Sequence, residues 1–76
     1  MRRRTSLQIM AEILSFCRQP QAKTRVMYRT NLSWKAAQKY LSQLQSQELL
    51  EIRNSPFKYV TTQKGLNFVE KWTELT

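Results

Sequence analysis

Cationic and amide side chains dominate the stretch between Lys23 and Gln47, and they set the chemistry that the chain can perform. No aspartate or glutamate lies between Glu12 and Glu48. The stretch meanwhile carries a set of cations, which are Lys23, Arg25, Arg29, Lys35 and Lys39. Ammonium and guanidinium groups pair with phosphates, and glutamine and serine side chains can hydrogen-bond to base edges. The residue types therefore indicate nucleic-acid binding, although a charge run can also be merely a solvated face.

The overall charge also points to a polyanionic partner. The 76 residues carry a formal net charge of +8, which favours DNA, RNA or an anionic membrane surface. A membrane is the least favoured of these partners, because no apolar run in the chain approaches the length of roughly 20 residues that spans a bilayer. No apolar segment of a signal peptide follows Arg2, Arg3 and Arg4. We therefore expect a cytoplasmic, nucleoid-associated protein.

The chain has few of the side chains that catalysis and metal binding require. The only carboxylate side chains are five glutamates, and histidine is absent. General acid–base catalysis and Cys/His zinc sites depend on clusters of such residues. The single cysteine, Cys17, cannot form an internal disulfide and is expected to be a small buried residue of the first helix. We expect neither an enzyme nor a cofactor, and the sequence identifies no small-molecule effector.

A short helix is predicted at the start of the basic stretch. Thr24 is the expected N-cap, and the helix reaches Arg29 with Val26 and Met27 facing inward. The dipeptide Thr30-Asn31 then supplies a turn before the next helix. Two helices joined by so short a turn have the outline of a helix-turn-helix.

The second helix of that pair carries the candidate reading face. Ser33 is placed to cap its N-terminus, and the helix is expected to end near Gln47. At 100° per residue, one arc is a core face made of Ser33, Ala37, Tyr40, Leu41, Leu44 and Glu48. The opposite arc, with its margins, holds Lys35, Gln38, Lys39, Ser42, Gln43 and Ser46. Trp34, at the edge of the core arc, is expected to pack rather than to stack on a base.

A first helix and a β-hairpin frame this pair. Residues 7–18 are helical in pattern, with a cap at Thr5 or Ser6 and a stop at the Gln19-Pro20 dipeptide. Alternating residues predict strands at 49–53 and 57–61 around a turn at 54–56, with Phe57 and Tyr59 inward and Lys58 and Val60 outward. Arg53 and Lys58 would then put two charges at the tip of a small wing.

Apolar surface on the first and last helices predicts a homodimer. We interpret residues 1–76 as a single domain with a basic arm at 1–5 and a C-terminal helix, capped by Thr62, at 62–76. One stripe of the first helix, Leu7, Met10, Leu14 and Cys17, can cover the helix-turn-helix. The side chains expected to be left for a second subunit are Ile9, Ile13, Phe16, Phe68, Trp72 and Leu75. The alternative is that both stripes pack within one subunit.

The sequence resembles an archaeal winged-helix family of regulators and small chromatin proteins. The resemblance runs through T-R-V-M-Y from Thr24, N-L-S from Asn31, the Tyr40-Leu41 pair with Leu44, then Tyr59, and Thr62 with Lys64-Gly65-Leu66. It covers about residues 7–69. Thr61 departs from the pattern, since a larger apolar residue is usual there. The resemblance implies DNA binding through the third helix and the wing, usually as a dimer.

These observations favour a mainly helical α+β winged helix-turn-helix: three helices, a two-stranded wing and a C-terminal helix. We expect it to bind double-stranded DNA as a transcriptional regulator or a small chromatin protein. Lys35, Gln38, Lys39, Ser42 and Gln43 would face the major groove, with Gln38 or Gln43 suited to adenine. Phosphate contacts would come from Arg25, Arg29, Arg53 and Lys58. The alternative is a protein-interaction winged helix whose third helix docks an acidic partner.

Overall fold

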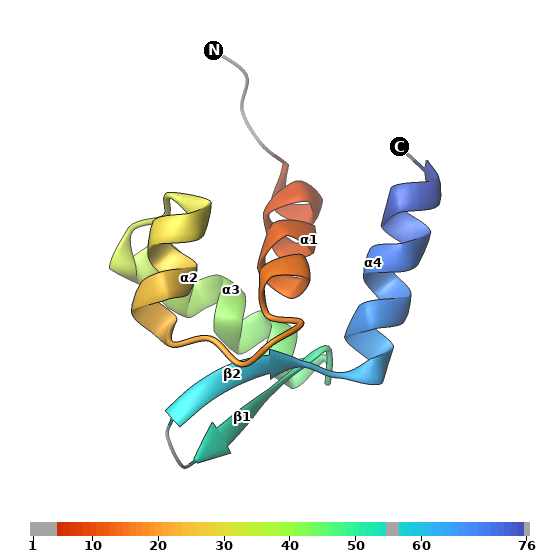
Figure 1. Cartoon of the computed structure of the whole chain (residues 1–76). Helices are drawn as coiled ribbons and strands as arrows, with labels where there is room; N and C mark the ends of the chain where they lie inside the picture. Colours follow the sequence, from red (N-terminus) through yellow and green to blue (C-terminus); the bar gives the residue numbers. More distant parts are fainter. Residues whose placement is uncertain (1–4, 55–56, 76) are drawn as a thin grey trace.

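The element order confirms the winged helix-turn-helix prediction. The computed structural model describes residues 5–54 and 57–75 (Figure 1). Its elements are α1 (Ser6–Phe16), α2 (Lys23–Thr30), α3 (Trp34–Ser46), β1 (Leu50–Asn54), β2 (Phe57–Thr61) and α4 (Gln63–Leu75). The predicted arm of arginines at 2–4 and the turn residues 55–56 lie outside the described residues. In Figure 1, α1 and α4 run side by side, and the hairpin lies beneath the helices.

Helix α1 begins at the first of the two predicted caps. The Thr5 hydroxyl accepts a hydrogen bond from the Gln8 backbone N–H at 3.1 Å, and the Gln8 side-chain oxygen accepts from the Thr5 N–H at 2.7 Å. This reciprocal capping box satisfies two backbone donors that would otherwise lack partners.

The buried face of α1 corrects the predicted division into two stripes. Ile13, Leu14 and Cys17 are fully buried and Ile9 is only 9% exposed, whereas Leu7 is 49% exposed. The expectation that Ile9 and Ile13 face away from the domain is therefore wrong. The two stripes are neighbours on the helix surface, and α1 packs against both α2 and α4, so one broad face is buried within the subunit.

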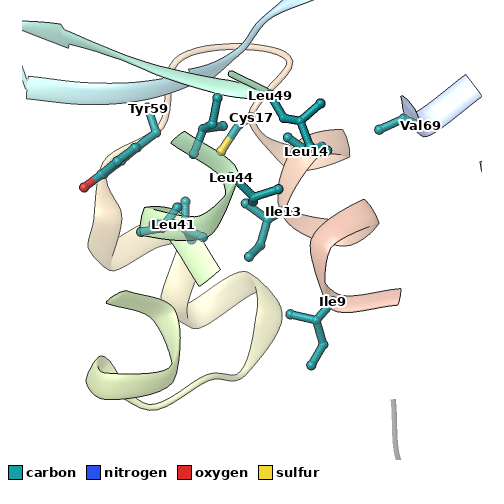
Figure 2. Close-up of a cluster of buried hydrophobic side chains, with 11 residues drawn as sticks. Ile9, Ile13, Leu14, Cys17, Leu41, Leu44, Leu49, Tyr59 and Val69 are labelled. Atoms are coloured by element: carbon teal, nitrogen blue, oxygen red, sulfur yellow. The ribbon is translucent and has the colours of Figure 1, made fainter. Parts of the chain in front are cut away.

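The core lies where α1, α3 and the hairpin meet. Figure 2 shows Ile13 and Leu44 pointing toward one another, with Leu14 and Leu49 close by and Val69 approaching from α4. On α3, Ala37, Leu41 and Leu44 of the predicted core arc are buried and Tyr40 is half-buried. Ser33 and Glu48, at the two ends of that arc, are exposed. Burying a leucine side chain of this kind stabilises the fold by about 1.5–3 kcal/mol. The core therefore fixes which face of α3 is left for solvent.

Helix α2 differs from its prediction at both ends. It starts after Ala22, whose carbonyl accepts from the Val26 N–H at 3.1 Å, so Thr24 is not the N-cap but an exposed residue of the first turn. Thr30 belongs to the helix and is fully buried, and its hydroxyl is satisfied there by donating to the Val26 carbonyl at 2.7 Å. Asn31 makes the predicted turn with φ 56°, a left-handed conformation that asparagine tolerates.

The hairpin is attached to the helices by a bridge that the sequence did not indicate. β1 and β2 pair antiparallel, with Ile52 opposite Tyr59. On the other edge of β2, Gln21 exchanges two hydrogen bonds with Tyr59, at 2.9 and 2.8 Å, and the Thr61 N–H donates to the Cys17 carbonyl at 2.9 Å. The α1–α2 connection therefore covers that edge, which protects it and fixes the wing relative to the helix-turn-helix.

Residues 60–62 also join the hairpin to the helices. Val60, predicted to point outward, is buried at 6% exposure, although its partner Glu51 in the register is exposed. Thr61 is buried too, and its hydroxyl donates to the Leu14 carbonyl at 2.6 Å. This bond satisfies the buried hydroxyl of a threonine at the position where the archaeal resemblance led us to expect a larger apolar residue. Thr62 caps α4 as predicted, since its hydroxyl accepts from the Gly65 N–H at 3.1 Å.

Candidate nucleic-acid interface

The outward face of α3 carries the residues that the sequence predicted to read a base sequence. Ser33 caps the helix as expected, accepting from the Ala36 N–H at 3.1 Å. The side chains of Lys35, Gln38, Lys39, Ser42 and Gln43 are all exposed. They lie opposite the buried arc of the same regular helix. The structure therefore brings these five onto one continuous solvent-facing surface, which we call the α3 face.

The wing places its two cations directly against each other. Arg53 on β1 pairs in register with Lys58 on β2, and Arg53 is exposed while Lys58 is half-buried. Like charges opposite one another on neighbouring strands destabilise the pairing. An anion bound between them would remove this repulsion, so the arrangement suits a phosphate.

The two arginines of α2 are exposed but point to different surroundings. The Arg29 guanidinium lies 5.9 Å from the centre of the Phe16 ring, at the end of α1. Arg29 also lines an open groove between α1 and α4, which places its side chain away from the α3 face. Arg25 is exposed on α2, which packs against α3.

One cluster was missed by sequence reasoning. Lys23, at the start of α2, donates a hydrogen bond from Nζ to the side-chain oxygen of Gln38 on α3. The same Nζ lies 3.6 Å from the centre of the Trp34 ring, a cation–π contact. Trp34 is 59% exposed, so the packing expected of it at the edge of the core arc is limited to one side of the ring, where Lys23 lies. The cluster joins residues 15 positions apart, and only the angle between α2 and α3 could have revealed it.

The groove between α1 and α4 collects some of the predicted dimer residues. Its volume is about 900 Å³, and Phe16, Val69 and Trp72 contribute its apolar lining. Phe68 is partly buried against the core. Ile9 and Ile13 do not belong to the predicted dimer surface, because both are buried within the subunit. The side chain of Leu75 lies outside the part of the chain that the structure describes.

Other chemistry finds little support in the described part of the chain. No cluster of histidine, cysteine, aspartate or glutamate among residues 5–54 and 57–75 is arranged to hold a metal ion. Burial raises the pKa of the Cys17 thiol to about 12, so the thiolate needed for nucleophilic chemistry does not form at neutral pH. Within the same residues, no helix combines the length and apolar character that crossing a membrane requires.

The chain belongs to the winged helix-turn-helix family, which matches residues 3–76. It is similar in structure to Sso10a-2, a DNA-binding protein from Sulfolobus solfataricus, with a TM-score of 0.85 and 34% identity over 95% of this chain and 78% of that one. The archaeal resemblance predicted from the sequence is thereby confirmed. A comparison with curated protein sequences found no match.

The fold also recurs in ZitR of Lactococcus lactis. The TM-score is 0.73 at 23% identity, and the match covers 90% of this chain. A second ZitR structure, in complex with DNA, gives a TM-score of 0.67 at 21% identity over 91% of this chain. This chain spans about half of the ZitR chain, 48% and 50% in the two structures. At this identity the likeness concerns the fold alone.

Proposed function

We propose that this protein binds double-stranded DNA through α3 and the hairpin wing, as a transcriptional regulator or a small chromatin protein of the nucleoid. The observation that carries the proposal is the α3 face, which offers lysine, glutamine and serine side chains without a carboxylate. Membership of the winged helix-turn-helix family supports it. So does the likeness to Sso10a-2, which is a DNA-binding protein. The activity is binding rather than catalysis.

The dimensions of α3 suit the major groove of DNA. Its 13 residues span about 20 Å, and a groove about 12 Å wide admits one α-helix. In this arrangement the α3 face meets base edges, while Arg25, Arg53 and Lys58 meet phosphates on either side. Arg29 remains a candidate phosphate contact at the far side of α2. Base contacts specify a sequence, whereas phosphate contacts position the protein on any duplex.

This division of roles predicts two different mutant phenotypes. We expect Lys39→Ala or Gln43→Ala to change the ratio of affinities between duplexes by about fivefold or more, because each removes a proposed base contact. We expect Arg53→Ala with Lys58→Ala to weaken all duplexes alike, because the wing meets only phosphates. Fluorescence anisotropy against a panel of labelled duplexes measures both effects.

The matched control for the wing variant is Lys64→Ala with Lys71→Ala, which removes the same charge from exposed positions on α4. We expect this control to change affinity less than the wing variant. If the α3 variants rank every duplex as the parent does, α3 does not read DNA. If they leave affinity unchanged as well, α3 takes no part in duplex binding. A parent that binds no duplex favours the protein-interaction alternative.

We also propose that two subunits associate through α1 and α4, with the C-terminal helix as a dimerisation element. Leu7 is 49% exposed on α1, and Phe16 and Trp72 line the open groove between α1 and α4. Phe68 on α4 is only partly buried. A second subunit would cover this apolar surface and would place a second α3 along the duplex. The interface thus uses a narrower set of residues than the sequence suggested, without Ile9 and Ile13.

The dimer is tested by sedimentation equilibrium of the parent and of a Phe68→Glu, Trp72→Glu double variant. We expect the parent to be a dimer at protein concentrations of about tens of micromolar, which matches the affinity of a modest interface. We expect the variant to be a folded monomer. Leu32→Glu, a half-buried apolar residue away from this groove, is the matched control for charge insertion. A folded parent that stays monomeric at these concentrations contradicts the proposal.

A further inference from the structure

The cluster of Lys23, Trp34 and Gln38 has a consequence for which base the α3 face selects. Gln38 is exposed on α3, and its side-chain oxygen accepts a hydrogen bond from Lys23 Nζ. A lysine ammonium can only donate hydrogen bonds, so the contact fixes which end of the amide faces the lysine. The oxygen of Gln38 is turned toward α2, and its NH2 group is the end left for a ligand.

Trp34 holds the lysine in this position. The Trp34 ring centre lies 3.6 Å from Nζ, and the ring is 59% exposed. A cation over an indole face is attracted by the electron-rich ring. Lys23 as a whole is half-buried, and its ammonium contacts both of these α3 side chains. Lys23 is therefore anchored at two points on α3 rather than extended toward a distant phosphate.

We propose that Lys23 is a positioning residue that makes Gln38 select guanine instead of adenine, an inference that rests on the proposed binding of α3 in the major groove. A glutamine reads adenine by accepting from N6–H and donating to N7 at once. Here the accepting oxygen lies beside an ammonium, which repels the N6–H donor. Guanine presents only acceptors on this edge, O6 and N7, and the Nε2 group of Gln38 can donate to either of them. The earlier assignment of adenine then remains for Gln43 alone.

The test first finds the base pair at which Gln38→Ala abolishes the preference of the parent protein. Dissociation constants are then measured for duplexes that differ only at that base pair. We expect the parent to favour guanine over adenine there by about fivefold to a hundredfold. Lys23→Met should remove or reverse this ratio, because the Gln38 oxygen becomes free to accept. Lys23→Arg, which keeps a donor and a cation over Trp34, should retain it. Lys64→Met is the matched control for loss of one exposed lysine, and should leave the ratio unchanged.

A double-mutant cycle separates positioning from direct contact. In a Gln38→Ala background, Lys23→Met should no longer change the base ratio, since the lysine acts through the glutamine. Three outcomes overturn the inference while leaving duplex binding intact. The base ratio is unchanged in Lys23→Met, or Lys23→Met changes the ratio equally with and without Gln38. In the third outcome, the parent shows no base preference at any position. A parent that binds no duplex overturns the proposed function instead.

The free protein provides a second readout that does not depend on DNA. Lys23→Met should shift the side-chain NH2 resonances of Gln38 in a ¹H–¹⁵N correlation spectrum, because their amide loses its charged partner. The backbone resonances of Leu41 and Leu44 in the core should stay in place and show that the fold is retained. Unmoved Gln38 resonances overturn the inference even if DNA binding is confirmed.

Discussion

Replacing Gly65 by alanine is expected to lower the free energy of unfolding by about 3 kcal/mol, the upper part of the range for overpacked sites. A Cβ at this position would lie 2.3 Å from the Leu49 carbonyl oxygen and 2.5 Å from Thr61 Cγ2. The first of these atoms belongs to the backbone and cannot rotate away. Alanine favours a helix over glycine by about 1 kcal/mol, which is too little to offset the clash.

The clash lies where the wing and α4 are joined, so its relief must move one of them. Thr62, which caps α4 through the Gly65 N–H, also donates to the Glu48 carbonyl at 2.7 Å. Its own N–H donates to the Leu49 carbonyl at 3.1 Å. A shift of α4 would therefore strain the start of β1. The need for glycine here gives a physical reason for the Lys64-Gly65-Leu66 segment in the archaeal resemblance.

Thermal unfolding followed by circular dichroism measures the effect. A loss of about 3 kcal/mol corresponds to a fall in Tm of about 12 °C or more for a domain of this size. Asn67→Ala, at an exposed position of the same helix, is the matched control and should change Tm by a few degrees at most. A Gly65→Ala variant as stable as the parent would show that α4 does not approach Leu49 this closely.

Features set by local geometry were predictable from the sequence. Ser33 and Thr62 were identified as caps because a side-chain oxygen must satisfy the free N–H groups of the turn that follows it. The two faces of α3 followed from its 3.6-residue period, since Ala37, Leu41 and Leu44 fall on one arc. The place of Arg53 and Lys58 beside the turn of the wing followed from strand alternation and the position of the turn, whereas their direct pairing was seen only in the structure.

Features set by packing between elements were not predictable. Ile9 and Ile13 form a stripe as good as that of Leu7 and Met10, and only the positions of α2 and α4 decide which is buried. Val60 alternates outward along its strand and is nevertheless buried. A helical or strand period shows which residues share a face, but not how many faces the rest of the chain covers.

The candidate site divides in the same way. The residues of the α3 face were found from charge and period, and the structure leaves all of them exposed. The contact of Lys23 with Gln38 and Trp34 depends on the crossing of α2 and α3, which no spacing in the sequence encodes. The contact of Arg29 with Phe16 likewise depends on where α1 packs, which the sequence does not show.

Steep salt dependence of duplex binding is the second large effect that we expect. Arg25, Arg29, Arg53 and Lys58 are the proposed phosphate contacts of one subunit. Each phosphate neutralised releases condensed counterions and contributes about −0.9 to the slope of log affinity against log salt. Four contacts give a slope of about −3.6, so raising salt from about 50 to 200 mM should weaken binding by about a hundredfold. A bound dimer would show a steeper slope.

The most direct test is therefore an anisotropy titration of the parent chain with a duplex of about 20 base pairs, long enough for about two turns of DNA, repeated across this range of salt. The account predicts saturable binding with a slope of about −3.6 or steeper. It also predicts a slope shallower by about 1.8 for Arg53→Ala with Lys58→Ala, which removes two of the contacts. Absence of binding at the lowest salt, or a slope near zero, would contradict the claim that this protein binds DNA through these cations.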